Sequence, residues 1–174
     1  MIVILMGVTG TGKTTVGHLL AEATGWPFAE GDDYHSAANK QKMHAGIPLT
    51  DDDRVPWLAS LHAVLRGWYE RGQSGILACS ALKQSYRDTL VAGIPGDAWR
   101  FVLLDASPQL IGERLASRKG HYMNPGLLKS QFDTLEMPED AMRVSVDPGP
   151  EQIAASILDA LKIPAKPASA KTRP

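Results

Sequence analysis

Short apolar runs alternate with segments of helical periodicity along most of the chain. Strand-like runs lie at residues 2–6, 28–31, 76–79, 100–104 and 143–146. The segments that indicate helices lie between them, at residues 13–23, 37–45, 55–71, 82–90, 107–118 and 151–161. Continuously apolar strands are typical of a sheet that is buried on both faces. The alternation therefore predicts an α/β fold with a mostly parallel sheet between two layers of helices.

Two polar segments and one tail do not follow this alternation. Residues 34–53 and 119–138 are long polar insertions. Insertions of this kind in α/β domains commonly act as substrate clamps or lids. Residues 164–174 carry no large apolar side chain. We therefore expect a single domain over residues 1–163, followed by a disordered tail.

Composition and charge narrow the class of protein. The 174 residues include 18 Lys and Arg and 19 Asp and Glu, for a net charge of −1. This balance gives no indication of binding to nucleic acid or to an anionic membrane. No apolar run approaches the ~20 residues of a membrane span, and the first residues lead into a glycine loop instead of forming a signal peptide. The single cysteine, Cys79, excludes an intramolecular disulfide. We expect a soluble, cytoplasmic protein.

Residues 7–14 match the complete phosphate-loop (P-loop) pattern Gly-x-x-x-x-Gly-Lys-[Ser/Thr]. A predicted strand precedes the motif and a predicted helix follows it, as this pattern requires. Its glycines allow successive backbone N–H groups to point at phosphate oxygens. Lys13 would neutralise the β- and γ-phosphates of ATP, and the Thr14 hydroxyl is a hard oxygen ligand suited to Mg²⁺. The predicted nucleotide-binding residues of the loop are Gly7, Val8, Thr9, Gly10, Thr11, Gly12, Lys13, Thr14 and Thr15.

The motif predicts that the protein binds a nucleotide, but it does not identify the reaction. Water-activating NTPases usually carry an acidic residue at the end of a neighbouring strand. Here the third predicted strand ends in Ala78-Cys79-Ser80, without an acid. A small-molecule kinase instead needs a carboxylate near the γ-phosphate and cations that stabilise the transition state.

Three further groups of residues supply this chemistry. Glu30 and Asp32 follow the second predicted strand, where ligands bind in open α/β sheets. Arg54 is a cation in the first turn of a predicted helix, where it opposes the helix dipole, so it needs a functional or salt-bridging reason. A basic cluster follows near the predicted lid, and it consists of Arg114, Arg118, Lys119 and His121.

Taken together, these motifs resemble those of the gluconokinase family, which are P-loop small-molecule kinases similar to nucleoside-monophosphate and shikimate kinases. The resemblance extends over about residues 2–162. Its most specific blocks are Asp53-Arg54-x-Pro56-Trp57-Leu58 and Cys79-Ser80-Ala81-Leu82-Lys83. Further matching segments are 5–14, 30–35, 42–51, 86–88, 114–122 and 128–138.

The resemblance implies a fold and an activity. The fold would be a three-layer P-loop kinase fold with a five-stranded parallel sheet in the order 2-3-1-4-5. A substrate clamp would lie at about residues 33–70 and a lid at about 118–138. The activity would be transfer of the ATP γ-phosphate to the 6-hydroxyl of D-gluconate, with Mg²⁺. A homodimer is common in the family, and the sequence leaves the oligomeric state open.

The chemistry of an anionic polyol assigns a role to each candidate residue. Asp32 would orient and deprotonate the reacting hydroxyl, and Glu30 would join Thr14 near Mg²⁺. Arg114 and Arg118 would close over ATP, Arg118 stabilising the phosphoryl transition state. The residues expected to hold the sugar acid are Arg54, Ser80, Lys83, Arg87 and His121. Two alternatives remain open: another kinase of this fold, for shikimate-like acceptors or nucleotides, and an ATP-binding module without transfer chemistry.

Overall fold

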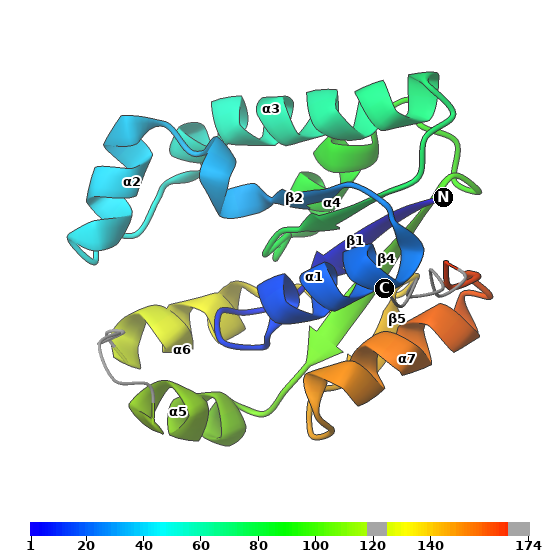
Figure 1. Cartoon of the computed structure of the whole chain (residues 1–174). Helices are drawn as coiled ribbons and strands as arrows, with labels where there is room; N and C mark the ends of the chain where they lie inside the picture. Colours follow the sequence, from blue (N-terminus) through cyan, green and yellow to red (C-terminus); the bar gives the residue numbers. More distant parts are fainter. Residues whose placement is uncertain (118–124, 167–174) are drawn as a thin grey trace, which may run out of the picture.

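The structure, a computed structural model, describes residues 1–117 and 125–166. Its centre is a five-stranded sheet whose paired strands all run parallel, in the order β2-β3-β1-β4-β5 (Figure 1). The strands are β1 (Ile2–Met6), β2 (Phe28–Glu30), β3 (Gly75–Ala78), β4 (Trp99–Asp105) and β5 (Met142–Ser145). The predicted fold class and strand order are confirmed.

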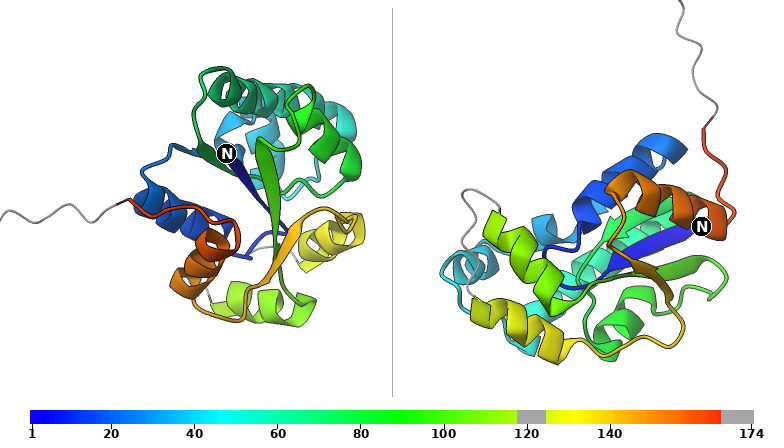
Figure 2. Two further views of the ribbon diagram at one scale, coloured as in Figure 1. Left: turned by 90° about the vertical axis from the view of Figure 1, so that its right-hand side faces the viewer. Right: turned by 90° about the horizontal axis from the view of Figure 1, so that it is seen from below.

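Seven α-helices and one short 3-10 helix connect the strands in the described residues (Figures 1 and 2). The α-helices are α1 (Lys13–Thr24), α2 (Ala37–His44), α3 (Asp51–Glu70), α4 (Gln84–Val91), α5 (Pro108–Ser117), α6 (Pro125–Thr134) and α7 (Pro150–Ala160). The 3-10 helix η1 (Gly31–Tyr34) directly follows β2. Within the described residues, no helix is both long enough and apolar enough to cross a membrane.

The central strand β1 is buried on both faces because its side chains alternate between two hydrophobic clusters. Ile2, Ile4 and Met6 face a cluster to which α3 and α4 contribute Leu61, Leu65, Trp68 and Leu90. Val3 and Leu5 face the opposite cluster, to which α1 and α7 contribute Val16, Leu20, Ile153 and Ile157. The two clusters form the core, and they fix the sheet between two helical layers (Figure 2).

A third and smaller cluster attaches the segment after α5 to the P-loop. Val8 and Ile111 are buried there, and Leu128, Phe132 and Leu135 pack against them. Residues 125–134 form helix α6, which the sequence analysis treated only as part of a lid insertion. The spacing of Leu128, Phe132 and Leu135 is helical and was the signal for this helix.

Helix α3 begins earlier than the pattern predicted. It starts at Asp51 instead of residue 55, because Thr50 accepts a hydrogen bond from the backbone N–H of Asp53 while the Asp53 side chain accepts one from the N–H of Thr50. This reciprocal capping box stabilises the first turn. Part of the polar segment 34–53 is therefore helical. The tail predicted for residues 164–174 lies mostly outside the described residues, and its residue Lys166 donates a backbone hydrogen bond to the carbonyl of Ala23.

Candidate active site

The P-loop connects β1 to α1 at the carboxyl edge of the sheet. Its glycines Gly7, Gly10 and Gly12 have φ angles of 135°, 81° and 94°, which side chains rarely adopt. A Cβ on Gly7 would also lie 2.8 Å from the carbonyl oxygen of Leu104. Gly12 caps α1 without a side-chain hydrogen bond, so the N–H groups of the first turn are left for an anion. The unusual backbone angles predicted for these glycines are confirmed.

Lys13 places its ammonium group against the loop. Its Nζ donates hydrogen bonds to the carbonyl oxygens of Gly7 (3.0 Å) and Val8 (2.9 Å). Burial lowers the pKa of Lys13, and the negative charge of Asp32, followed by smaller contributions from Cys79 and Glu30, acts in the opposite direction. Lys13, which is predicted to bind phosphate, therefore lies within electrostatic range of Asp32, the predicted base.

Thr14 and Glu30 lie in direct contact. The Thr14 hydroxyl donates a 2.6 Å hydrogen bond to Oε2 of Glu30. A hydroxyl and a carboxylate side by side are the hard oxygen donors that Mg²⁺ prefers. The two residues predicted as metal ligands thus fit a divalent cation, which would lie beside the phosphate-binding loop.

The turn that carries Asp32 is held tightly to the end of β3. A Cβ on Gly31 would lie 2.6 Å from the carbonyl oxygen of Ala78, so glycine is required by close approach to the neighbouring strand. The Trp57 indole N–H of α3 donates a 2.7 Å hydrogen bond to the carbonyl of Gly31. Strand β3 and helix α3 together fix the position of Asp32.

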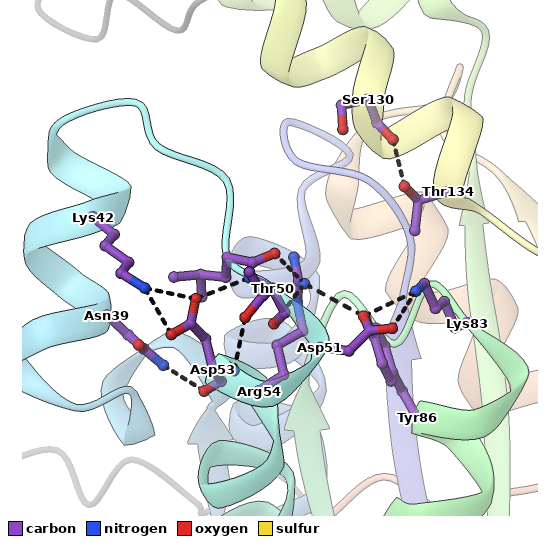
Figure 3. A network of polar contacts seen from close by, with 11 residues as sticks. Asn39, Lys42, Thr50, Asp51, Asp53, Arg54, Lys83, Tyr86, Ser130 and Thr134 are labelled. Carbon is purple, nitrogen blue, oxygen red and sulfur yellow. Dashed lines mark hydrogen bonds and ion pairs between the residues drawn. The ribbon is translucent and has the colours of Figure 1, made fainter.

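Arg54 closes the loop that precedes α3 (Figure 3). Its Nη1 donates hydrogen bonds to the carbonyl oxygens of Leu49 (2.5 Å) and Thr50 (3.2 Å), and it lies 3.9 Å from Oδ1 of Asp51. These acceptors offset the unfavourable position of a cation in the first turn. All three of these contacts are made by Nη1. The Arg54 side chain is 26% exposed to solvent.

Asp53 connects the start of α3 to α2 (Figure 3). Lys42 donates hydrogen bonds of 2.8 Å and 2.9 Å to its two carboxylate oxygens. The Lys42 hydrogen bond, followed by that from the Thr50 backbone, lowers the pKa of Asp53 to about 2. The Asn39 side chain also donates to the backbone carbonyl of Asp53, at 2.7 Å. Together these contacts join the two helices of the predicted clamp.

Asp51 connects the same helix to α4. Lys83 donates to both carboxylate oxygens of Asp51, at 2.9 Å and 2.7 Å, and the Tyr86 hydroxyl donates to Oδ1 (Figure 3). Arg54 and Lys83 approach the Tyr86 ring, with distances to its centroid of 5.6 Å and 5.5 Å. The structure thus brings together two predicted substrate-binding cations, Arg54 and Lys83. The sequence analysis did not identify Tyr86 as part of this group.

Two other predicted substrate residues lie in the segment between β3 and α4. Ser80 is half-buried beside the P-loop, and its carbonyl accepts a 3.2 Å hydrogen bond from the N–H of Gly7. Arg87 is buried, and its guanidinium donates to the carbonyls of Ala81 and Leu82 and to the Gln84 side chain. These bonds give Arg87 a structural role, while its predicted contact with substrate stays a prediction.

A cavity of about 230 Å³ adjoins the P-loop. Arg114 lines it, and its Nη2 donates a 2.5 Å hydrogen bond to the carbonyl of Val146. Pro148 and Pro150 line it as well, next to the residues of the P-loop. Arg118, Lys119 and His121, the other members of the basic cluster, lie outside the described residues.

Gln131 of α6 is a site residue that the sequence analysis missed. Its Oε1 accepts a 2.7 Å hydrogen bond from the backbone N–H of Thr9, in the middle of the P-loop. The two residues are 122 positions apart. The contact places α6 directly against the nucleotide-binding loop.

Two buried residues complete the surroundings of the site. Cys79 is buried at the end of β3, and burial raises the pKa of its thiol to about 12. The ring of His35 is stacked on that of Trp57, with centroids 4.4 Å apart and 11° between the planes. Neither residue was given a role from the sequence.

Comparison with known proteins identifies relatives that are similar to this protein over most of its length. Residues 2–138 match the family described as an AAA domain. A protein of Rattus norvegicus named probable gluconokinase is 47% identical in an alignment that covers 92% of this chain and 97% of the relative. The gluconokinase of Gluconobacter oxydans (strain 621H) is 46% identical over 160 residues, with coverages of 89% and 88%. A gluconokinase crystal structure from Sinorhizobium meliloti 1021 has a TM-score of 0.82 at 43% identity, with coverages of 92% and 90%.

Proposed function

The chain belongs to the gluconokinase family, and on that premise we propose that it transfers the γ-phosphate of ATP to the 6-hydroxyl of D-gluconate. The products are 6-phospho-D-gluconate and ADP. The observation that carries the proposal is the grouping of Lys13, Asp32 and the Thr14–Glu30 pair at one sheet edge. Arg54 lies in the proposed clamp, and Lys83 contacts the start of α3 through its ion pair with Asp51.

The nucleotide is bound by the P-loop and the start of α1. Backbone N–H groups of the P-loop and of the first turn of α1 bind the phosphates, and Lys13 exchanges its contacts with Gly7 and Val8 for phosphate oxygens. The cavity lined by Arg114 and Pro148 takes the remainder of the nucleotide. Thr14 and Glu30 would hold Mg²⁺, which supplies charge neutralisation at the phosphates when it is bound.

Asp32 accepts the proton of the attacking hydroxyl. The hydroxyl oxygen forms a bond to the γ-phosphorus while the bond from that phosphorus to the ADP oxygen breaks. Lys13 stabilises the charge on the transferring group, and we assign Arg118, with Arg114, to the same task. Asp32 is suited to the role of base because it is exposed, lies close to Lys13 and sits on a turn fixed by Gly31 and Trp57.

The sugar acid is held by the clamp, which we place at residues 33–70. The gluconate carboxylate pairs with Arg54 and Lys83, since a planar guanidinium and an ammonium both suit an exposed carboxylate. Ser80 contributes a hydroxyl to the polyol, and we assign His121 of the proposed lid, residues 118–138, to the same acceptor. Arg87 acts through the 81–84 segment that it holds in place.

An ADP-release assay with purified protein tests the proposal. The acceptors are D-gluconate, shikimate, D-glucose and a set of nucleoside monophosphates, with ATP and Mg²⁺ present throughout. We expect ADP formation to depend on gluconate and the product mass to match 6-phosphogluconate. Transfer to shikimate or a nucleotide alone would identify another kinase of this fold, and ATP binding without transfer to any acceptor would identify a binding module. Gel filtration determines whether the protein is a monomer or a homodimer, and fractionation of cells tests the expected cytoplasmic location.

A further inference from the structure

The imidazole of His35 is buried with one nitrogen unsatisfied. His35 is 8% exposed. Across the parts of the chain that the structure describes, its Nδ1 is the one buried side-chain nitrogen or oxygen without a hydrogen-bond partner. The other buried polar side chains there, those of Thr11, Asn39 and Arg87, all make hydrogen bonds. A buried polar group left unpaired destabilises the folded state, so its retention needs a reason.

Packing alone does not explain a histidine at this position. The ring stacks flat on Trp57, which a phenyl ring would do equally well. The hydrogen bond of residue 35 to its neighbours uses the backbone, where its N–H donates to the carbonyl of Asp32 at 3.4 Å. Nothing in the described contacts therefore uses the ring nitrogen Nδ1.

The position of His35 indicates what would use it. The residue directly follows η1, which carries Asp32, and it precedes α2 of the clamp. Burial is the main cause that lowers its pKa, Asp32 raises that pKa, and Arg54 and Lys40 lower it. The ring is thus neutral at neutral pH and lies within electrostatic range of the proposed base and the proposed carboxylate-binding arginine.

We propose that His35 is a specificity-determining residue whose Nδ1 hydrogen-bonds a hydroxyl of the sugar acid held between Asp32 and Arg54. The inference rests on the proposed function. Since no described residue pairs with Nδ1, the partner it gains is a group of the substrate that enters the clamp. A hydroxyl satisfies the nitrogen in either tautomer, since a hydroxyl both donates and accepts, whereas a methylene does neither. The site would therefore select polyhydroxy acids over deoxy analogues.

The decisive variant is His35→Phe, which keeps a flat ring on Trp57 and removes the nitrogen. We expect the KM for gluconate to rise about 3- to 10-fold, the range of one hydrogen bond. The KM for ATP should not change. The melting temperature should stay equal or rise, because an unpaired buried polar atom has been removed.

His35→Asn, which places an amide near the position of Nδ1, should recover part of the gluconate affinity. The matched control is His18→Phe, since His18 lies on α1 with its ring against Phe28.

Monodeoxy gluconates then locate the hydroxyl. Against the wild type, the analogue that lacks the partner hydroxyl should bind more weakly than gluconate, and this difference should disappear in His35→Phe. If the wild type neither binds nor phosphorylates gluconate, the proposed function fails and this inference fails with it. If the wild type uses gluconate and His35→Phe has an unchanged KM, or discriminates the analogues as before, the inference alone is overturned. A lower melting temperature in His35→Phe with unchanged gluconate KM would make His35 a packing residue.

Discussion

The Thr14 hydroxyl donates a 2.6 Å hydrogen bond to the carboxylate of Glu30, which joins the first turn of α1 to the end of β2. The contact pairs a P-loop side chain with one from a different strand end. In the proposed function, these two oxygens are the ones assigned to the Mg²⁺ that accompanies the nucleotide phosphates.

Thr14→Val should raise the Mg²⁺ concentration required for half-maximal activity by about tenfold or more, because a direct oxygen ligand is lost while the side-chain volume is kept. Activity measured across a Mg²⁺ titration at saturating ATP and gluconate checks this. Thr24→Val at the other end of the same helix is the control. An unchanged Mg²⁺ requirement would remove Thr14 from the metal site.

Asp32→Asn should lower kcat by about 10²–10⁴-fold, the usual cost of losing a general base. Binding of ATP, measured by calorimetry, should change little, since Asp32 is not part of the phosphate loop. Asp33→Asn alters the exposed neighbouring carboxylate and should leave kcat near the wild-type value. Turnover retained by Asp32→Asn would show that another group takes the proton.

Arg54→Ala should weaken gluconate binding and leave the KM for ATP unchanged. It also removes the hydrogen bonds to Leu49 and Thr50, so the free energy of unfolding should fall by about 1–3 kcal/mol. Arg54→Lys keeps a charge but lacks the planar guanidinium, and it should recover only part of both effects. Arg66→Ala, on the same helix, is the control because Arg66 pairs with Glu70 at the surface, about three turns along the helix from Arg54. A defect confined to ATP affinity would place Arg54 in the nucleotide site.

Gly31→Ala should both destabilise the protein and lower kcat. The new methyl group would lie 2.6 Å from the carbonyl of Ala78, and relief of such an overlap typically costs about 1–3 kcal/mol. The same shift would displace the turn that carries Asp32. Chemical denaturation and steady-state kinetics measure the two effects. Gly112→Ala is the matched control, because a Cβ there meets nothing within 4 Å.

Acid should weaken the start of α3 through Asp53. Its pKa is lowered to about 2 by Lys42 and Thr50, so the unfolded chain binds a proton more readily than the folded one. The stabilisation from the ionised Asp53 is therefore complete above about pH 4 and is lost as the pH falls toward 2. Asp53→Asn should reduce the loss of stability over this range, measured by denaturation at a series of pH values. An identical pH profile for wild type and variant would contradict the prediction.

The features that the sequence predicted are those that local patterns determine. The P-loop has an unbroken motif between a strand and a helix, and the positive φ angles of its glycines follow from that motif. The strand order came from the family resemblance, because apolar runs alone do not say which strands are neighbours.

The features that were missed depend on contacts between distant residues. Gln131 meets Thr9 across 122 positions, and Lys83 meets Asp51 across 32. No local signal reports such pairs. Arg54 shows the intermediate case, since its unfavourable place in a first turn was visible in the sequence, but the carbonyls that accept its hydrogen bonds were not.

The raised pKa of Cys79 also has a practical consequence for labelling chemistry. Alkylating reagents attack thiolates, and a buried thiol with a pKa of about 12 carries essentially none at neutral pH. Since Cys79 is the sole cysteine of the chain, a fluorophore coupled to the folded protein will attach only where a second cysteine is introduced. Ile47 is 53% exposed in the loop between the two clamp helices, so an Ile47→Cys protein offers a single-site optical reporter of clamp movement on a native background.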